Sequence, residues 1–287
     1  MDKFYTKPHI AQECIQMVFN RYPWNMWDLV VEPSAGNGSF FHQLPIVQNK
    51  IAMDIAPEHP SIHQQDFLTF VPDNDTHQRI LTIGNPPFGK VSSMAIQFFN
   101  HASKWSTVIA FIVPRTFRRV SVQNKLNPSF HLVFDYEIPI QPCAFEPSMM
   151  AKCCFQIWEK QEQYPRDKVV YPSTHPDWDF LKYGPLDERN QPTPPVNADF
   201  AIRAYGGRCG EIRINQLDQL RPKSWHWISS KIDKDTLIER FRVLDYSQSV
   251  DTARQNSIGK RDLVHLYQEH YYLKISNFFF CDYVLQK

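Results

Sequence analysis

The sequence lacks the features that would place it in a membrane, outside the cell or around a zinc ion. No apolar run approaches the ~18 residues that cross a bilayer. The first residues, MDKFYTKPHIAQE, contain no apolar core of a signal peptide. None of the six cysteines forms a C-x-x-C pair, so their spacing indicates no zinc site and reduced thiols are expected. We therefore expect an intracellular protein, cytoplasmic or nuclear.

A strong net charge is also missing. The chain carries 31 Lys and Arg against 30 Asp and Glu, so charge alone predicts no nonspecific partner. In contrast, hydrophobic residues make up 43% of the chain and aromatic residues 14%, enough for a sizeable core and unlike a disordered protein. A length of 287 residues suits one large domain with a smaller second one.

Residues 1–160 alternate strand-like and helix-like segments, the pattern of a doubly wound α/β fold. We predict a mostly parallel, seven-stranded Rossmann-like sheet. The fully apolar run STVIAFIVP is typical of a strand covered on both faces. Helices are expected at 9–22, 37–44 and 92–105, and strands at 27–34, 50–57, 62–68, 78–84, 106–114, 130–138 and 152–160.

The character of the chain changes after residue 160. Seven of its 22 prolines lie in 161–197, which we interpret as a linker or surface arm. Residues 198–287 form a smaller α+β lobe, with strands around a Gly-Gly turn and a helix at 260–272. This lobe has 14 Lys and Arg against 11 Asp and Glu, a mild excess in the direction of nucleic-acid binding and a substrate-recognition role.

The stretch VVEPSAGNGSF carries a glycine turn directly behind a strand. Gly36 and Gly38 let the backbone turn sharply and let a ligand approach closely. A dinucleotide fingerprint is disfavoured, because Phe41 occupies the position of its third glycine and Glu32 would repel a diphosphate. An acid there suits a cationic or hydroxyl-rich ligand.

Two further acids end the next strands. Asp54 lies eighteen residues after Gly36, the spacing that places a carboxylate on ribose hydroxyls. Asp66 could accept a hydrogen bond from an exocyclic amine, with Phe67 beside the base. Each acid alone fits a helix cap or a solvated turn equally well, but open α/β sheets bind ligands at the edge where all three strands end.

The stretch TIGNPPFGK puts two prolines, an aromatic residue and a glycine behind a buried strand, where neither strand nor helix can continue. With this motif, the chain resembles S-adenosylmethionine-dependent N6-adenine methyltransferases that carry an N-P-P-F tetrapeptide, over residues 1–160. The resemblance implies that FYTKP contacts the methionine end of the cofactor and EPSAGNGSF forms the cofactor loop. The implied cofactor-binding residues are Tyr5, Thr6, Pro8, Glu32, Pro33, Ser34, Ala35, Gly36, Gly38, Asp54, Asp66, Phe67 and Asn85.

The resemblance also implies roles at the N-P-P-F corner. The Asn85 side-chain oxygen and the Pro86 carbonyl would hold the two N–H bonds of the adenine amine. Pro87 would help to fix that carbonyl, and Phe88 would stack on a flipped-out base. No metal is required. A rigid surface turn is the alternative for these residues taken alone.

Other candidates are weaker. Lys90, Arg115, Arg118 and Arg119 could hold substrate phosphates or form solvated basic turns. Phe145 is a second stacking candidate. The segment KSWHWI, with Trp225, His226 and Trp227, could stack on bases, although a buried aromatic core is the more typical use.

The predicted activity is N6-methylation of adenine in nucleic acid, with DNA slightly favoured over ribosomal or cap-adjacent RNA. One rival is N5-methylation of a protein glutamine, although that branch more often carries Tyr where this chain has Phe88. The other rival is a catalytically silent nucleic-acid-binding subunit. The oligomeric state does not follow from the sequence.

Overall fold

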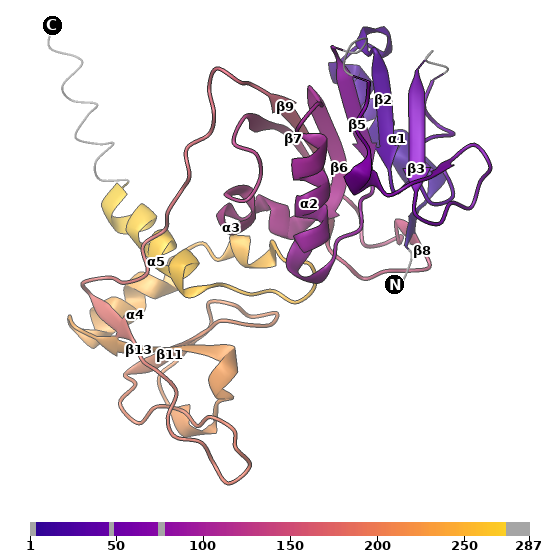
Figure 1. The fold of residues 1–287 in the computed structure, drawn as a ribbon. Helices are drawn as coiled ribbons and strands as arrows, with labels where there is room; N and C mark the ends of the chain where they lie inside the picture. Colours follow the sequence, from indigo (N-terminus) through magenta and orange to yellow (C-terminus); the bar gives the residue numbers. More distant parts are fainter. Residues whose placement is uncertain (1–3, 46–48, 74–77, 274–287) are drawn as a thin grey trace, which may run out of the picture. The chain divides into compact units, whose positions relative to one another are not determined.

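The computed structural model describes residues 4–45, 49–73 and 78–273. The chain divides into two compact units, Met1–Val169 (unit 1) and Val170–Lys287 (unit 2) (Figure 1). Strand β10 (Trp178–Phe180) lies within the segment expected to be an arm, yet it pairs with a strand of unit 2. Much of the proline-rich segment therefore belongs to the second unit rather than linking two bodies. Across the described residues, no helix combines the length and apolarity that a bilayer crossing requires.

Unit 1 contains a seven-stranded sheet in the order β4-β3-β2-β5-β6-β9-β7. All neighbouring pairs are parallel except those of β9, which runs antiparallel to both β6 and β7. This arrangement confirms the expected doubly wound, mostly parallel fold. The strands are β2 (Leu29–Pro33), β3 (Lys50–Asp54), β4 (His63–Gln64), β5 (Ile80–Gly84), β6 (Val108–Pro114), β7 (Phe130–Glu137) and β9 (Cys153–Lys160).

Helices cover both faces of this sheet. Helix α1 (Pro8–Arg21) packs with Val108, Ala110 and Ile112 of β6, whereas the residues between them pack with α2 (Ser93–Ala102). Figure 1 shows α2 crossing one face. Because successive side chains of a strand point to opposite faces, burial on both sides requires apolar residues at every position, which explains the unbroken apolar run of β6. A short helix, α3 (Val120–Gln123), precedes β7.

The helix expected at 37–44 is absent, and consecutive turns replace it. Two helix-like hydrogen bonds do form, from His42 N to Gly38 O and from Leu44 N to Phe40 O. However, the Lys50 ammonium donates to the carbonyl oxygens of Phe41 and Leu44, at 3.1 and 3.3 Å. A cation on these carbonyls and positive φ angles at Gly36 and Gly38 favour turns over a regular helix.

A two-stranded antiparallel sheet anchors the N-terminal motif. Strand β1 (Tyr5–Thr6) pairs with β8 (Phe145–Glu146), so that Thr6 lies opposite Phe145. Lys7 N also donates to Ala144 O at 2.9 Å. Long-range pairing therefore joins the N-terminal motif to a distant segment of unit 1.

Unit 2 contains a four-stranded sheet in the order β10-β13-β11-β12, with all pairs antiparallel. Its other strands are β11 (Phe200–Arg203), β12 (Ile212–Arg213) and β13 (Trp225–Ser230). Helices α4 (Lys234–Arg242) and α5 (Lys260–Gln268) pack on it, and a π-helical turn (Glu269–Leu273) extends α5. The α+β character is as expected, but the sequence analysis did not predict β13 and α4.

Candidate functional site

The ends of β2 and β5 create the candidate site of unit 1. The chain leaves β2 for β3 and β4 on one side and returns through β5 on the other, so the connections diverge here. Such a switch point is where open α/β sheets bind ligands. Gly84 lets the ends of β5 and β2 approach each other closely, because a Cβ at this position would lie 3.3 Å from Glu32 Cγ and 3.4 Å from Pro33 O. Sequence reasoning did not single out Gly84.

The glycine loop after β2 is held by Asp54 at the end of β3. Its Oδ2 accepts from Gly36 N at 2.9 Å and its Oδ1 accepts from Ala56 N at 2.8 Å. Two more backbone bonds tie the loop down, from Ala35 N to Met53 O and from Glu58 N to Gly36 O, both 2.9 Å. A carboxylate has about four lone-pair sites, so Asp54 can shape the loop and still accept from a ligand.

Strand β1 lies against this loop. A Cβ on Gly36 would come within 2.4 Å of Tyr5 Cε1, so only glycine lets the Tyr5 ring lie there. The Tyr5 hydroxyl donates to the Glu58 carboxylate. Asn85 Nδ2 donates to the Phe4 carbonyl at 3.4 Å. The structure thus brings together Tyr5, Gly36, Asp54 and Asn85 from distant parts of the sequence.

Several buried polar atoms of these elements have no hydrogen-bond partner among the described residues. They are Thr6 Oγ1, Glu32 Oε2, Ser34 Oγ and Asn85 Oδ1. Buried polar groups in proteins are nearly always paired, because leaving one unpaired costs about 1–3 kcal/mol. All four atoms belong to residues that the sequence predicted for the site. Their arrangement suits a ligand rich in N–H and O–H donors.

Glu32 is the buried acid of this group, with an exposed fraction of 2%. Burial raises the pKa of its carboxyl well above the ordinary value, and the backbone N–H groups of Phe41 and Phe40 oppose that shift only partly. A positively charged or donating ligand beside Glu32 would favour the ionised form. Without such a ligand, burial favours the neutral carboxyl, so the expected repulsion of an anionic diphosphate stays a prediction.

The N-P-P-F corner follows β5 directly. Pro86 is buried, and Pro87 and Phe88 are half-buried. The Phe88 carbonyl accepts from Met94 N at 3.2 Å and Ala95 N at 3.4 Å, which joins the corner to the start of α2. The Phe88 ring packs at the edge of the α1 core and keeps part of its surface exposed.

The segment after this corner has an unusual backbone. Gly89, Val91 and Ser92 have φ angles of 67°, 52° and 61°. Left-handed backbone is uncommon outside glycine and is unfavourable for a β-branched residue such as Val91. The Ser92 hydroxyl is held by Thr116 Oγ1 at 2.7 Å, from the turn after β6. The sequence did not indicate this strain, since Val91 is β-branched and is not a residue type expected in left-handed backbone.

The remaining predicted cofactor residues lie in more ordinary settings. Pro8 is exposed in the first turn of α1, where a missing N–H costs nothing. Pro33 ends β2, and Ala35 is buried in the glycine loop. The Asp66 carboxylate accepts from Leu68 N at 2.9 Å and caps a short 3₁₀ helix (Phe67–Thr69), which is the helix-cap alternative.

Phe67 takes a place that the sequence did not predict. Its side chain is 2% exposed and packs against Phe98 and His101 at centroid distances of 5.0 and 5.1 Å. The ring therefore belongs to the core under α2 and does not lie beside a base. Phe145 is likewise 2% exposed, within the α1 core, so its ring offers no stacking surface.

The basic residues after β6 are largely neutralised. Arg115 is buried and pairs with Glu137, while Arg118 pairs with Asp135 and lies 3.6 Å from Glu137. These carboxylates of β7 already occupy the guanidinium groups that were candidates for substrate phosphates. Arg119 is half-buried, and Lys90 is exposed beside the N-P-P-F corner. The described part of the chain contains no group of three or more His, Cys, Asp or Glu that could hold a metal.

No family model and no curated protein matches the sequence. The chain is similar in fold to a proposed RNA methyltransferase from Pyrococcus horikoshii, with 17% identity over 53% of this chain and 85% of that chain, and a TM-score of 0.40. The magnesium protoporphyrin IX methyltransferase of Synechocystis, solved with bound SAM, has 8% identity over 54% and 79%, with a TM-score of 0.41. An S-adenosylmethionine-dependent methyltransferase from Clostridium acetobutylicum has 9% identity over 53% and 91%, with a TM-score of 0.38.

Proposed function

We propose that this chain is an S-adenosylmethionine-dependent methyltransferase that modifies the N6 amine of adenine in nucleic acid. The observation that carries the proposal is the set of buried, unpartnered oxygens of Thr6, Glu32, Ser34 and Asn85 at one sheet edge. A bound ligand would satisfy such groups. The oxygens of Thr6, Glu32 and Ser34 can accept hydrogen bonds, which fits an ammonium and hydroxyl-bearing cofactor better than an anion, and the Asn85 oxygen can accept from the substrate amine.

The residues of the glycine loop fit this cofactor. Asp54, at the end of β3, would accept from the ribose hydroxyls, and Glu32 and Thr6 would face the amino-acid end. The backbone at Gly36 allows a ligand to approach, with the Tyr5 ring next to it. Bound there, S-adenosylmethionine supplies an electrophilic methyl group on a positively charged sulfur.

Asn85 and Pro86 would act on the substrate. The amine of adenine is a weak nucleophile because its lone pair is delocalised into the ring. Asn85 Oδ1 and the Pro86 carbonyl would accept hydrogen bonds from its two N–H groups and favour a pyramidal nitrogen aimed at the methyl group. In the transfer, the N–C bond would form while the electron pair of the C–S bond stays on sulfur, and the nitrogen would then lose a proton to solvent. The part-exposed ring of Phe88 would stack on the base.

The proposal is tested by one substitution at the reacting corner. Asn85→Ala removes the acceptor, and we expect methyl transfer to fall below detection while cofactor affinity changes less than severalfold. The assay offers radiolabelled S-adenosylmethionine to duplex DNA, total RNA, capped RNA and protein, followed by chromatography of the digested product. Cofactor affinity is measured by calorimetry. Asn124→Ala is the matched control, because the Asn124 amide pairs with the Val169 backbone instead.

Each outcome of this assay has a distinct meaning. Label in N6-methyladenine supports the proposal and decides between DNA and RNA. Label in protein glutamine would move the activity to the rival class. Retained transfer by Asn85→Ala would refute the role of Asn85, and a wild-type protein that binds no S-adenosylmethionine would overturn the proposal as a whole.

A further inference from the structure

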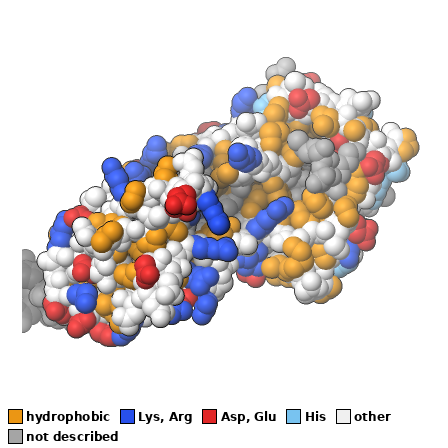
Figure 2. All heavy atoms as spheres, turned by 90° about the horizontal axis from the view of Figure 1, so that it is seen from below, with side chains coloured by type: hydrophobic (Ala, Val, Ile, Leu, Met, Phe, Trp, Pro, Cys, Tyr) orange, Lys and Arg blue, Asp and Glu red, His pale blue; other side chains and the backbone are white. Residues whose placement is uncertain are grey.

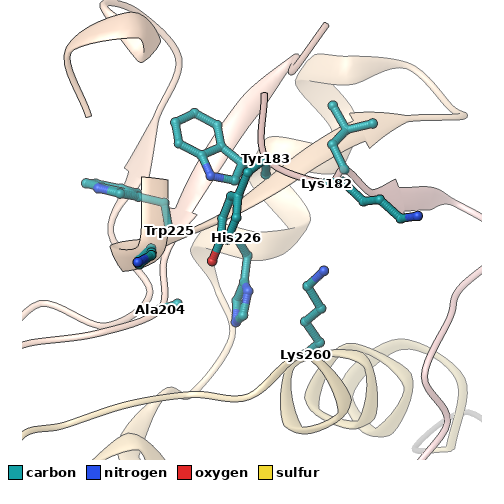
Figure 3. Close-up of a pocket in the computed structure, with 9 residues that line it drawn as sticks. Lys182, Tyr183, Ala204, Trp225, His226 and Lys260 are labelled. Atoms are coloured by element: carbon teal, nitrogen blue, oxygen red, sulfur yellow. The ribbon is translucent and has the colours of Figure 1, made fainter. Parts of the chain in front are cut away.

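Unit 2 contains a cavity of about 510 Å³, separate from the sheet edge of unit 1 in its residues and in its character. Aromatic side chains and lysines make up most of its lining. Figure 3 shows Tyr183 and His226 close together, with Lys260 extending from its helix toward them. We infer that this cavity binds one nucleotide of a single-stranded nucleic acid.

The charge of the cavity favours an anion. Lys182, Lys223 and Lys260 line it, and no Asp or Glu does. Within the described residues, no carboxylate forms an ion pair with any of the three ammonium groups. They come from three separate segments, around β10, β13 and α5, so the fold rather than a local run of basic residues gathers them. Figure 2 shows that unit 2 exposes Lys and Arg side chains beside hydrophobic ones.

Trp225, His226 and Trp227 of β13 form the buried aromatic part of the cavity lining. Trp225 and Trp227 are 6% and 1% exposed. They belong mainly to the core of unit 2, which is the use that the sequence analysis gave as more typical. Trp227 Nε1 donates to Pro222 O at 3.1 Å, and His226 Nε2 lies 2.8 Å from Ile258 O. These bonds hold both side chains in place, and the low exposure of the two Trp rings leaves little of their faces open for stacking.

Tyr183 supplies the open ring. It is 47% exposed and lines the cavity. A base that stacks on an aromatic ring must first leave its own stack, which is easy in a single strand and costly in a duplex. A ring and an anion-binding rim in one cavity are the two parts that a nucleotide needs, and the volume is within the range of small-ligand sites.

The choice of nucleic acid over another polyanion rests on the proposed function. The test therefore measures binding directly, without a methyl donor. Fluorescein-labelled 12-mers of single-stranded DNA and RNA are titrated with the full chain, and anisotropy is followed from 50 to 200 mM salt. An acidic polyglutamate peptide serves as the competing polyanion.

The variants separate charge from stacking. Replacing Lys182, Lys223 and Lys260 together by Ala should weaken binding at least tenfold in 50 mM salt and flatten its salt dependence, since each phosphate contact contributes about −0.7 to the slope. Tyr183→Ala should weaken binding about tenfold with an unchanged slope. Lys234→Ala and Tyr205→Ala are the matched controls, because both residues are exposed in unit 2 outside the cavity and Tyr205 has the same 47% exposure.

The outcomes distinguish this inference from the proposed function. Equal affinity of the triple-lysine variant and wild type, or no binding by wild type, would overturn the cavity assignment. Polyglutamate that displaces the oligonucleotide at equal concentration would also overturn it, in favour of an acidic protein segment. Binding lost in the variants but no methyl transfer to any nucleic acid would refute the proposed function and leave the cavity assignment standing.

Discussion

At the scale of single residues, Glu32 is the residue from which a pH dependence of stability is expected. Its carboxyl is buried, and desolvation raises its pKa in the folded chain above the ordinary value of 4.5. The folded state therefore binds a proton more tightly than the unfolded state does. Stability conferred by protonated Glu32 is complete below pH 4.5 and is lost as pH rises through the folded pKa.

Glu32→Gln should remove this pH dependence. We expect the variant to exceed wild type in free energy of unfolding by more than about 1 kcal/mol at pH 7, with the difference vanishing near pH 4. Urea unfolding across pH 4–8 measures it. Parallel pH profiles for the two proteins would show that Glu32 does not carry the effect. Under the proposed function, the same variant should bind S-adenosylmethionine more weakly. Burial of Glu32 would then lower stability at neutral pH but contribute to cofactor binding.

At the scale of elements, the turn after the N-P-P-F corner stores strain. Val91 has φ 52° and ψ 41°, and its side chain is 75% exposed, so it gains little from burial. The bonds from Met94 and Ala95 to Phe88 O on one side and from Ser92 to Thr116 on the other hold this backbone in place. Strain of this kind is retained where the surrounding contacts over-determine a conformation.

Val91→Asn should relieve part of that strain, because Asn tolerates left-handed backbone. We expect the variant to be about 1 kcal/mol more stable than wild type. Thermal and urea unfolding provide the measurement. Val196→Asn is the matched control, since Val196 is 93% exposed without a positive φ, and its substitution should change stability by less than about 0.5 kcal/mol. Equal effects at both positions would exclude backbone strain as the cause.

At the scale of the whole molecule, the chain has separate cores. The clusters beneath α1 and α2 lie in unit 1, whereas Phe241 and Leu237 of α4 belong to a cluster whose members all come from unit 2. A defect in one core should therefore leave the other intact.

Phe241→Ala tests this independence. Phe241 is 0% exposed, so its loss should cost unit 2 about 3–5 kcal/mol. Hydrogen exchange followed by mass spectrometry should show lost protection in β11, β13 and α5, with β5 and β6 unchanged. Equal loss of protection in β5 and β6 would mean that the units unfold together.

The sequence by itself determined the sheet of unit 1 and predicted the residues of its candidate site. Strand and helix periods follow from which faces are buried, so the alternation along residues 1–160 predicts a doubly wound sheet. Once that sheet is expected, Glu32, Asp54 and Asn85 fall at strand ends on one edge, because parallel strands end on the same side. Motif order and backbone rules were sufficient for these residues.

Tertiary structure alone decided what each side chain faces. Phe67 and Phe145 are ring-bearing residues at the expected positions, yet packing with α2 and α1 placed both rings in cores. Arg115 and Arg118 form ion pairs with carboxylates of β7, about twenty residues later in the sequence. Strand β9 lies between β6 and β7 in the sheet, so this proximity depends on the tertiary structure. The cavity with Tyr183 joins four separate segments of unit 2. Burial and charge pairing depend on contacts between residues far apart in the chain, and no local pattern encodes them.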